Sequence, residues 1–183
     1  MQSAETGTVH AQIVDMVTFA MSGGGSGSVT NPSGIQVYTP GTQQAITATP
    51  GAGYSFSSWS ATTTSGSITF LNSSSSSTTA TINGNGTVTA TFIQTLYSVS
   101  FATSGGGSST TSPTGTQSYT LNEAVPISAS PASGYTFSNW SATSGITFDS
   151  ATSASTTAHI GAAGTITATF TQTKYSVSFV MSG

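Results

Sequence analysis

The chain contains two copies of one sequence unit, and this internal repeat limits its fold more than any other feature. The first copy, FAMSGGGSGSVTNPSGIQVYTPGTQQAITATPGAGYSFSSWSA, begins at Phe19 and aligns with FATSGGGSSTTSPTGTQSYTLNEAVPISASPASGYTFSNWSA, which begins at Phe101. The second halves agree as well, because SITF and TTATINGNGTVTATF correspond to GITF and TTAHIGAAGTITATF. Any fold for this chain therefore has to contain the same small structure twice.

Short strands separated by turns are the expected structure of each repeat. Apolar and polar residues alternate with period two in Gly34–Tyr38, Ala45–Ala48 and Thr87–Phe92, as in strands with one buried face. Thr, Val, Ile and Phe favour such strands, whereas SGGGSGS and NGNG mark turns. No stretch has helical periodicity with caps. We therefore predict an all-β fold of two tandem, small, β-rich repeats.

The scarcity of charge restricts the partners of this chain. Charged residues make up 3% of it and the net charge is −3 at pH 7, whereas about 25% charged residues is usual. Lys174 is the one Lys or Arg, which excludes nucleic acid because phosphate binding needs several. So small a net charge favours self-association. Nine Phe and six Tyr, set in regular alternation, argue against disorder.

Aromatic residues near the middle of each repeat are the predicted core anchors. They come from GYSFSSW and GYTFSNW, and they are Tyr54, Phe56, Trp59, Tyr135, Phe137 and Trp140. Each contributes about 1.5–3 kcal/mol when buried. Phe56 is expected to be a period-two neighbour of Trp59 on the buried face of the strand. The alternative is that Trp59 stacks on sugar rings at the surface.

The repeat resembles a known family. The stretch TATPGAGYSFSSWSA, followed by a Thr/Val strand that ends in TATF, is similar to the divergent internalin-type B-repeats, also called bacterial repeat domains. The glycine-rich opening between Gly23 and Gly34 fits this family too. The resemblance covers most of the chain and implies tandem modules of secreted or cell-surface proteins, without catalytic residues. The near-absence of charge differs from a solvated stalk and favours a packing role.

The alignment continues to both ends of the chain. Gly7–Ile13 matches the strand that closes repeat 1, and the segment from Tyr175 matches the strand that opens repeat 2 at Tyr97. We therefore expect four parts: the closing strand of an incomplete repeat in residues 1–16, repeat 1 in 17–96, repeat 2 in 97–174, and the opening strand of an incomplete repeat in 175–183.

A strand without partners leaves its backbone N–H and C=O groups free to pair with another chain. We predict exchange between subunits, in which the end of one molecule completes a sheet of the next. The predicted polymerisation residues are Val9, Ala11, Ile13, Tyr175, Val177 and Phe179. Two alternatives stay open: the chain is an excerpt of a longer tandem array, or its end strands pair within their own chain.

The titratable residues do not indicate an enzyme. Four acids are spread through the chain without a matched pair across the repeats, and there is no Cys and no G-x-S-x-G motif. His10 and His159 occupy different repeat positions and are expected at the surface. Calcium sites need clustered carboxylates, which are absent. We therefore predict no catalytic residue, no metal site and no cofactor.

Two further surface features concern modification. Three N-x-[ST] sequons make Asn72, Asn85 and Asn139 candidate glycosylation sites. Lys174 precedes the terminal strand, where it either protects an exposed strand as a charged gatekeeper or forms a covalent cross-link to a neighbour.

These observations together predict an exported structural protein that assembles with itself into a filament, tube or sheath. The expected location is extracellular or on the cell surface, after removal of a signal that this chain does not contain, and no membrane span is expected. Cell-envelope glycans are a further candidate partner. The rival function is a cell-surface adhesin stalk or a carbohydrate-binding module that uses Trp59 and Trp140.

Overall fold

The computed structural model describes residues 13–25, 28–143 and 145–181, and the chain divides into two compact units, Met1–Gln94 and Thr95–Gly183. Every regular element in the described residues is a β-strand, which confirms the all-β prediction. The strands of unit 1 are β1 (Asp15–Ser22), β2 (Val29–Asn31), β3 (Gly34–Tyr38), β4 (Thr42–Thr49), β5 (Tyr54–Thr63), β6 (Ser67–Phe70), β7 (Ser77–Asn83) and β8 (Gly86–Gln94). Those of unit 2 are β9 (Tyr97–Ser104), β10 (Thr110–Ser112), β11 (Gly115–Tyr119), β12 (Glu123–Ser130), β13 (Tyr135–Ala142), β14 (Ile146–Phe148), β15 (Ser155–Ile160) and β16 (Gly164–Gln172).

Each unit consists of two four-stranded sheets. In unit 1 the strand orders are β3-β1-β8-β5, which we call the opening sheet because it contains the first strand, and β2-β4-β7-β6, the second sheet. Unit 2 repeats both orders as β11-β9-β16-β13 and β10-β12-β15-β14. One hydrophobic cluster in each unit draws residues from both of its sheets. Each unit is therefore a β-sandwich, a point that the sequence left open against a barrel.

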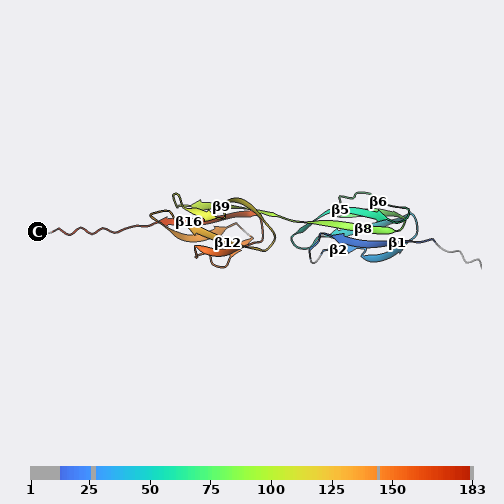
Figure 1. Cartoon of the computed structure of the whole chain (residues 1–183), viewed down its shortest axis with the longest axis horizontal. Helices are drawn as coiled ribbons and strands as arrows, with labels where there is room; N and C mark the ends of the chain where they lie inside the picture. Colours follow the sequence, from blue (N-terminus) through green and yellow to red (C-terminus); the bar gives the residue numbers. More distant parts are fainter. Residues whose placement is uncertain (1–12, 26–27, 144, 182–183) are drawn as a thin grey trace, which may run out of the picture. The chain divides into compact units, whose positions relative to one another are not determined.

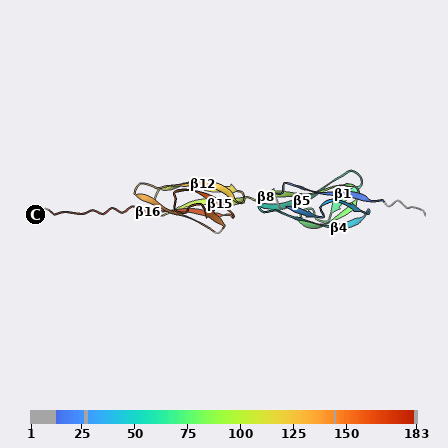
Figure 2. The ribbon, with the colours of Figure 1, turned by 90° about the horizontal axis from the view of Figure 1, so that it is seen from below.

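The opening sheet joins the first and last strands of its own unit. β1 pairs with β8 in parallel, from Val17 opposite Gly86 to Ser22 opposite Thr91, and β9 pairs with β16 in the same way. The other strand pairs are antiparallel. Because the first and last strands run in the same direction, the chain enters a unit at one end and leaves it at the other. Figures 1 and 2 show these strands running lengthwise through each unit.

Period-two alternation places the core between the two sheets. In unit 1, Val17 and Val88 of the opening sheet and Ile46 and Ile82 of the second sheet have no exposed surface. Polar Thr and Ser residues of the same strands face outward. This arrangement follows the rule that successive strand residues point to opposite faces.

The expectation that Phe56 is a period-two neighbour of Trp59 is wrong, because the two residues are three positions apart. A β-bulge resolves the mismatch: Phe56 lies opposite Phe92 but Ser58 lies opposite Thr91, so that one extra residue is inserted in β5. The bulge turns both aromatic rings to the same face, with centroids 5.6 Å apart. Unit 2 has the same bulge, and its two rings are 5.5 Å apart.

Each tryptophan also fixes the Ser-rich loop that follows it. The indole Nε1–H of Trp59 donates to the carbonyl of Ser75 at 3.0 Å, and its backbone N–H donates to the carbonyl of Ser73 at 2.8 Å. Trp140 donates in the same way to Ser153 and Ala151. A buried indole N–H needs such a partner. The loop NSSSSS is therefore exposed in its side chains but bound through its backbone.

Gly23 is required where β1 ends. Its φ is 75°, and an added Cβ would lie 2.3 Å from the carbonyl oxygen of Phe92. The matching Gly105 has a φ of 74°, and its Cβ would lie 2.5 Å from the carbonyl oxygen of Phe170. Only Gly tolerates this conformation and this approach together. The glycine run of each repeat thus lets the chain cross closely over its closing strand.

Asp15 occupies a buried position at which the two units have different residues. It is 6% exposed, and its Oδ2 is buried without a hydrogen-bond partner among the described residues. It lies opposite Tyr38 at the start of β1, where unit 2 has Tyr97 opposite Tyr119. Tyr97 packs against the core of unit 2. The Oδ2 of this carboxyl group therefore loses its hydration without a hydrogen bond from the described residues.

We therefore expect Asp15→Tyr to raise the free energy of unfolding of unit 1 by about 1–3 kcal/mol, because it removes an unsatisfied buried group. Urea unfolding measures the effect, with Trp59 as the only tryptophan in a Trp140→Phe background. The reverse exchange, Tyr97→Asp, is the matched control and should destabilise unit 2, as followed by Trp140 in a Trp59→Phe background. Unchanged midpoints for both exchanges would contradict this account of Asp15.

Candidate assembly surfaces

The tail segment, Tyr175–Met181, follows β16 without joining a sheet. It is not part of any strand ladder, and the exposed fractions of Tyr175, Val177 and Phe179 are 82%, 72% and 90%. Figure 1 shows it as an extended trace that continues from the end of β16. The alternative that this end strand pairs within its own chain is therefore wrong for the described residues 175–181.

The tail segment has the sequence of a central strand. Tyr175-Ser176-Val177-Ser178-Phe179 repeats Tyr97–Phe101 of β9 residue for residue. In β9 the same five residues form a strand between β11 and β16, and Val99 is fully buried. One sequence thus occupies two environments, paired on both sides in β9 and unpaired in the tail segment. What differs is the presence of neighbouring strands.

The N-terminal candidates are only partly described. Val9 and Ala11 lie outside the described residues, and Ile13 is 76% exposed. β1 begins at Asp15, so the last two residues of the segment predicted as 1–16 belong to the first strand of unit 1. The exchange of terminal strands stays a prediction.

A second apolar surface lies on unit 1, where sequence reasoning did not place one. Met16, Ile35 and Val37 are 55%, 64% and 57% exposed. They lie on the outer face of β1 and of the edge strand β3, and we call them the β3 patch. Comparing the two repeats position by position would have found it, because unit 2 has only Ser and Thr at these places.

The tryptophans cannot present their rings to a sugar. Trp59 and Trp140 are 3% and 2% exposed and belong to the two cores. The other four predicted anchors are partly buried and pack against the same clusters; they are Tyr54, Phe56, Tyr135 and Phe137. The interpretation of either tryptophan as a surface platform is therefore wrong, and the carbohydrate-binding alternative loses the two residues on which it depended.

The three sequons lie in different surroundings. Asn72 is exposed, and its Oδ1 accepts the N–H of Ser74 at 2.9 Å. Asn85 is half-buried, its Oδ1 accepts the N–H of Met16 at 2.6 Å, and its Nδ2 donates to Ser65. Asn139 lies half-buried in the strand β13. Asn72 offers the most accessible side chain for modification.

One pair of titratable residues lies on the surface of unit 2. The Nε2 of His159 is 2.8 Å from the Oδ1 of Asp149. This hydrogen bond, and a second from Thr157, hold the pKa of Asp149 below its usual value. Burial raises the pKa of Tyr38, and burial together with the charge of Glu123 raises that of Tyr119. Across the described residues no three acids, His or Cys gather as metal ligands would.

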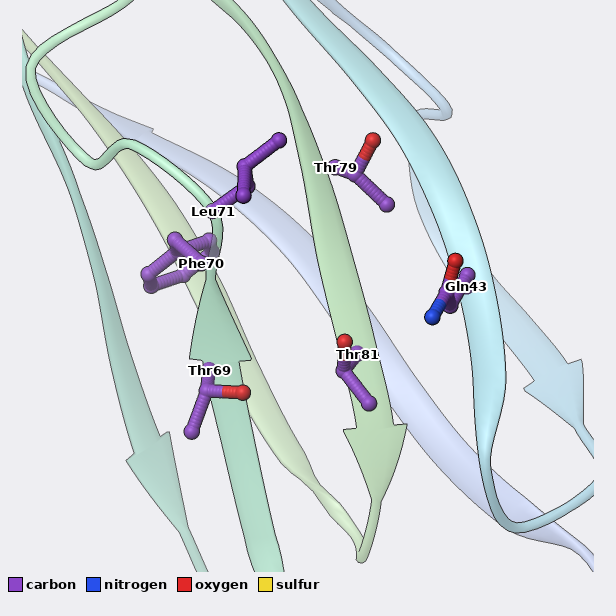
Figure 3. A pocket seen from close by; sticks show the side chains of 6 residues that line it. All are labelled: Gln43, Thr69, Phe70, Leu71, Thr79 and Thr81. Carbon is purple, nitrogen blue, oxygen red and sulfur yellow. The ribbon is translucent and has the colours of Figure 1, made fainter.

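A hollow of about 380 Å³ lies on unit 1 and is lined by Met16, Thr18, Thr64, Asn85, Gly86 and Thr87. Another, of about 210 Å³, lies on the outer face of the second sheet of unit 1 and is lined by Gln43, Thr69, Phe70, Leu71, Thr79 and Thr81. Figure 3 shows these side chains on neighbouring strands. The volume of this 210 Å³ hollow is smaller than that of a usual ligand site, about 300–1,000 Å³. No helix with the length and hydropathy to cross a membrane occurs in the described parts of the chain.

Comparison with known proteins gives one result. A family model described as the divergent InlB B-repeat domain matches residues 17–95 and 97–174, which together are most of the chain. No curated protein and no solved structure matches. The match confirms the resemblance and its two tandem copies.

The Asp149–His159 pair predicts an acid sensitivity that is specific to unit 2. The folded-state pKa of Asp149 is lowered from 3.8. Its contribution to the stability of unit 2 is therefore fully present above pH 3.8, and it is lost as the pH falls through the folded-state pKa. The thermal midpoint of unit 2 should therefore fall on acidification from pH 5 to pH 2.5. The fall should exceed that of a protein without the pair by at most a few degrees, because the pair is exposed to solvent. Trp140 fluorescence in a Trp59→Phe background measures it.

The control carries the residues that unit 1 has at the same two places, Asp149→Leu and His159→Thr. All other acids are unchanged, so their effects cancel in the comparison. Equal pH dependence of the two proteins would contradict the role of the pair.

Proposed function

The chain belongs to the divergent InlB B-repeat family, which is typical of cell-surface and secreted bacterial proteins, and from this premise we propose that it is a structural subunit of an extracellular filament, tube or sheath. The family is non-catalytic, and no catalytic domain is found in the chain. Assembly by strand complementation takes the place of a chemical step. The tail segment of one molecule is the donor strand, and the N-terminal half of the next molecule supplies the acceptor.

The observation that carries this proposal is the unpaired, apolar tail segment. Its free backbone groups and exposed aromatic and branched side chains are the features of a strand that pairs with another chain. Burying Tyr175, Val177 and Phe179 would contribute about 1.5–3 kcal/mol for each side chain. Ordering a flexible segment opposes this gain, so the acceptor has to be a preformed sheet.

The architecture of the units supports linear assembly. Because each unit is entered at one end and left at the other, a donor strand at the exit and an acceptor near the entrance lie at opposite ends of their units. Donor and acceptor surfaces differ, so the contact is heterologous and propagates into an open polymer or a ring. A net charge of −3 opposes such packing only weakly.

Glycans add a second element to the proposal. If the host glycosylates exported proteins, Asn72 is the residue whose exposure suits modification. It lies in the loop after β6, on neither the tail segment nor the β3 patch. Modification there would hydrate the subunit without blocking assembly.

Deleting residues 175–183 should abolish polymers while both units stay folded, because the tail segment contributes nothing to either core. Sedimentation velocity over a concentration series and electron microscopy measure assembly. The unfolding midpoints seen by Trp59 and Trp140 measure folding.

The matched control keeps the chain length and replaces only the apolar face of the tail segment, with Tyr175→Ser, Val177→Ser and Phe179→Ser. It should fail to assemble in the same way as the deletion. Polymers that form unimpaired from either variant would refute strand donation by this segment.

A further inference from the structure

We propose that the acceptor is the free edge of β3, to which the tail segment of a second copy adds as a fifth strand of the opening sheet. This inference rests on the proposed function and names the partner surface for it. It joins two exposed apolar surfaces of the described chain, the tail segment and the β3 patch.

The first argument is the open edge itself. β3 pairs with β1 on one side, and it is the last strand of its sheet on the other. Natural edge strands are protected by charged residues, by proline or by bulges. Gly34-Ile35-Gln36-Val37-Tyr38 has none of these. Among the described residues no strand pairs with its outward backbone groups.

The second argument is the position of the β3 patch. Met16 lies opposite Val37, and Thr18 lies opposite Ile35, on the outer face of the β1–β3 pair. A strand added beside β3 would place every second side chain next to Ile35 and Val37. Aromatic and branched residues in such cross-strand positions stabilise a sheet.

The third argument comes from unit 2, which serves as an internal control. It has the same strand order and register, but Ser98, Thr116 and Ser118 stand where unit 1 has Met16, Ile35 and Val37. Unit 2 forms the same sandwich without apolar side chains at these places. The β3 patch is therefore not needed for folding, and its exposure indicates a contact.

The tail segment has the side-chain pattern that this edge requires. Tyr175, Val177 and Phe179 alternate with Ser176 and Ser178. One face of the added strand is thus apolar and can lie beside the β3 patch, while serines take the other face. Uncharged segments of this kind are suited to β-augmentation, in which an extended peptide adds to a sheet edge.

The direction of the added strand follows from the repeat. A strand of this sequence already pairs with the β3 equivalent of unit 2: β9 is antiparallel to β11, with Tyr97 opposite Tyr119 and Val99 opposite Gln117. We therefore expect the tail segment to run antiparallel to β3, with its register shifted by one residue from that of β9 and β11 so that its apolar side chains lie beside Ile35 and Val37 rather than Gln36. It occupies the free side of β3, because β1 holds the other side.

The edge of β3 is a better acceptor than a lone N-terminal strand of the neighbour. Two strands by themselves are only marginally stable, whereas three or more with a hydrophobic face are stable. β3 belongs to a complete four-stranded sheet that rests on a core. The contact is with a second copy, and its dependence on concentration separates it from pairing within one chain.

The decisive variant gives unit 1 the residues of unit 2, with Met16→Ser, Ile35→Thr and Val37→Ser. It should fold normally and require at least about tenfold more protein for half-assembly. The matched control removes three other exposed apolar side chains of unit 1 in favour of the unit 2 residue, with Met21→Thr, Val29→Thr and Ile93→Thr. This control should assemble as the unaltered chain does. Sedimentation velocity measures both.

Cross-linking tests the contact directly, because the chain has no cysteine of its own. Chains with Val37→Cys, mixed with chains that carry Val177→Cys or Phe179→Cys, should form a disulfide between copies. Ser118→Cys, the equivalent place in unit 2, is the control and should not. Disulfides need Cβ atoms about 3.5–4.5 Å apart, so a selective product reports strand pairing.

The outcomes separate this inference from the proposed function. Assembly that is lost on deleting the tail segment but is unaffected by the β3 patch exchange would overturn β3 as the acceptor and leave strand donation standing. The same holds if deleting residues 1–12 alone abolishes polymers, which would favour the N-terminal strand. Polymers that persist without the tail segment would overturn both. A monomer whose cross-link does not depend on concentration would show pairing within one chain and would also overturn the inference.

Discussion

The parallel pairing of first and last strands in the opening sheet is the interaction on which each unit depends. It brings together segments about seventy residues apart and places both at the centre of a sheet, where Val17 and Val88 are fully buried. An antiparallel pair would return the chain to the end at which it entered. The parallel pair instead carries the chain through the unit, and this allows a short segment such as Thr95–Leu96 to connect one complete sandwich to the next.

The same pairing explains why β9 and the tail segment differ although they share a sequence. β9 is stable because β11 and β16 satisfy both of its edges and because its apolar face joins a core. The tail segment has the same sequence but, in the described part of the chain, is paired with no strand corresponding to β11 or β16. Strand propensity is therefore insufficient by itself, since the pairing partners decide whether the sequence is a buried strand or an exposed one. In the proposed head-to-tail assembly, another molecule would supply these partners.

Comparison of the two units separates what the fold needs from what the surface does. The glycine at the end of β1, the bulge in β5 and the indole-to-loop hydrogen bond recur in unit 2. Asp15, the β3 patch and the Asp149–His159 pair occur in one unit only. Recurrent features belong to the sandwich. Features found once are not required by the sandwich, because the other unit forms it without them, although they can change the stability of the unit that carries them.

The sequence by itself determined the all-β class, the two repeats and their family, because the repeat and the period-two alternation are local patterns. It also drew attention to the ends, since Tyr175–Phe179 repeats β9. The tertiary structure alone decided the sandwich, the parallel pair and the bulge that turns Phe56 and Trp59 to one face, and it confirmed the predicted burial of both tryptophans. It also revealed the β3 patch. These features depend on which strands are neighbours and which edge stays free, and strand order arises from contacts between residues that are distant in the chain.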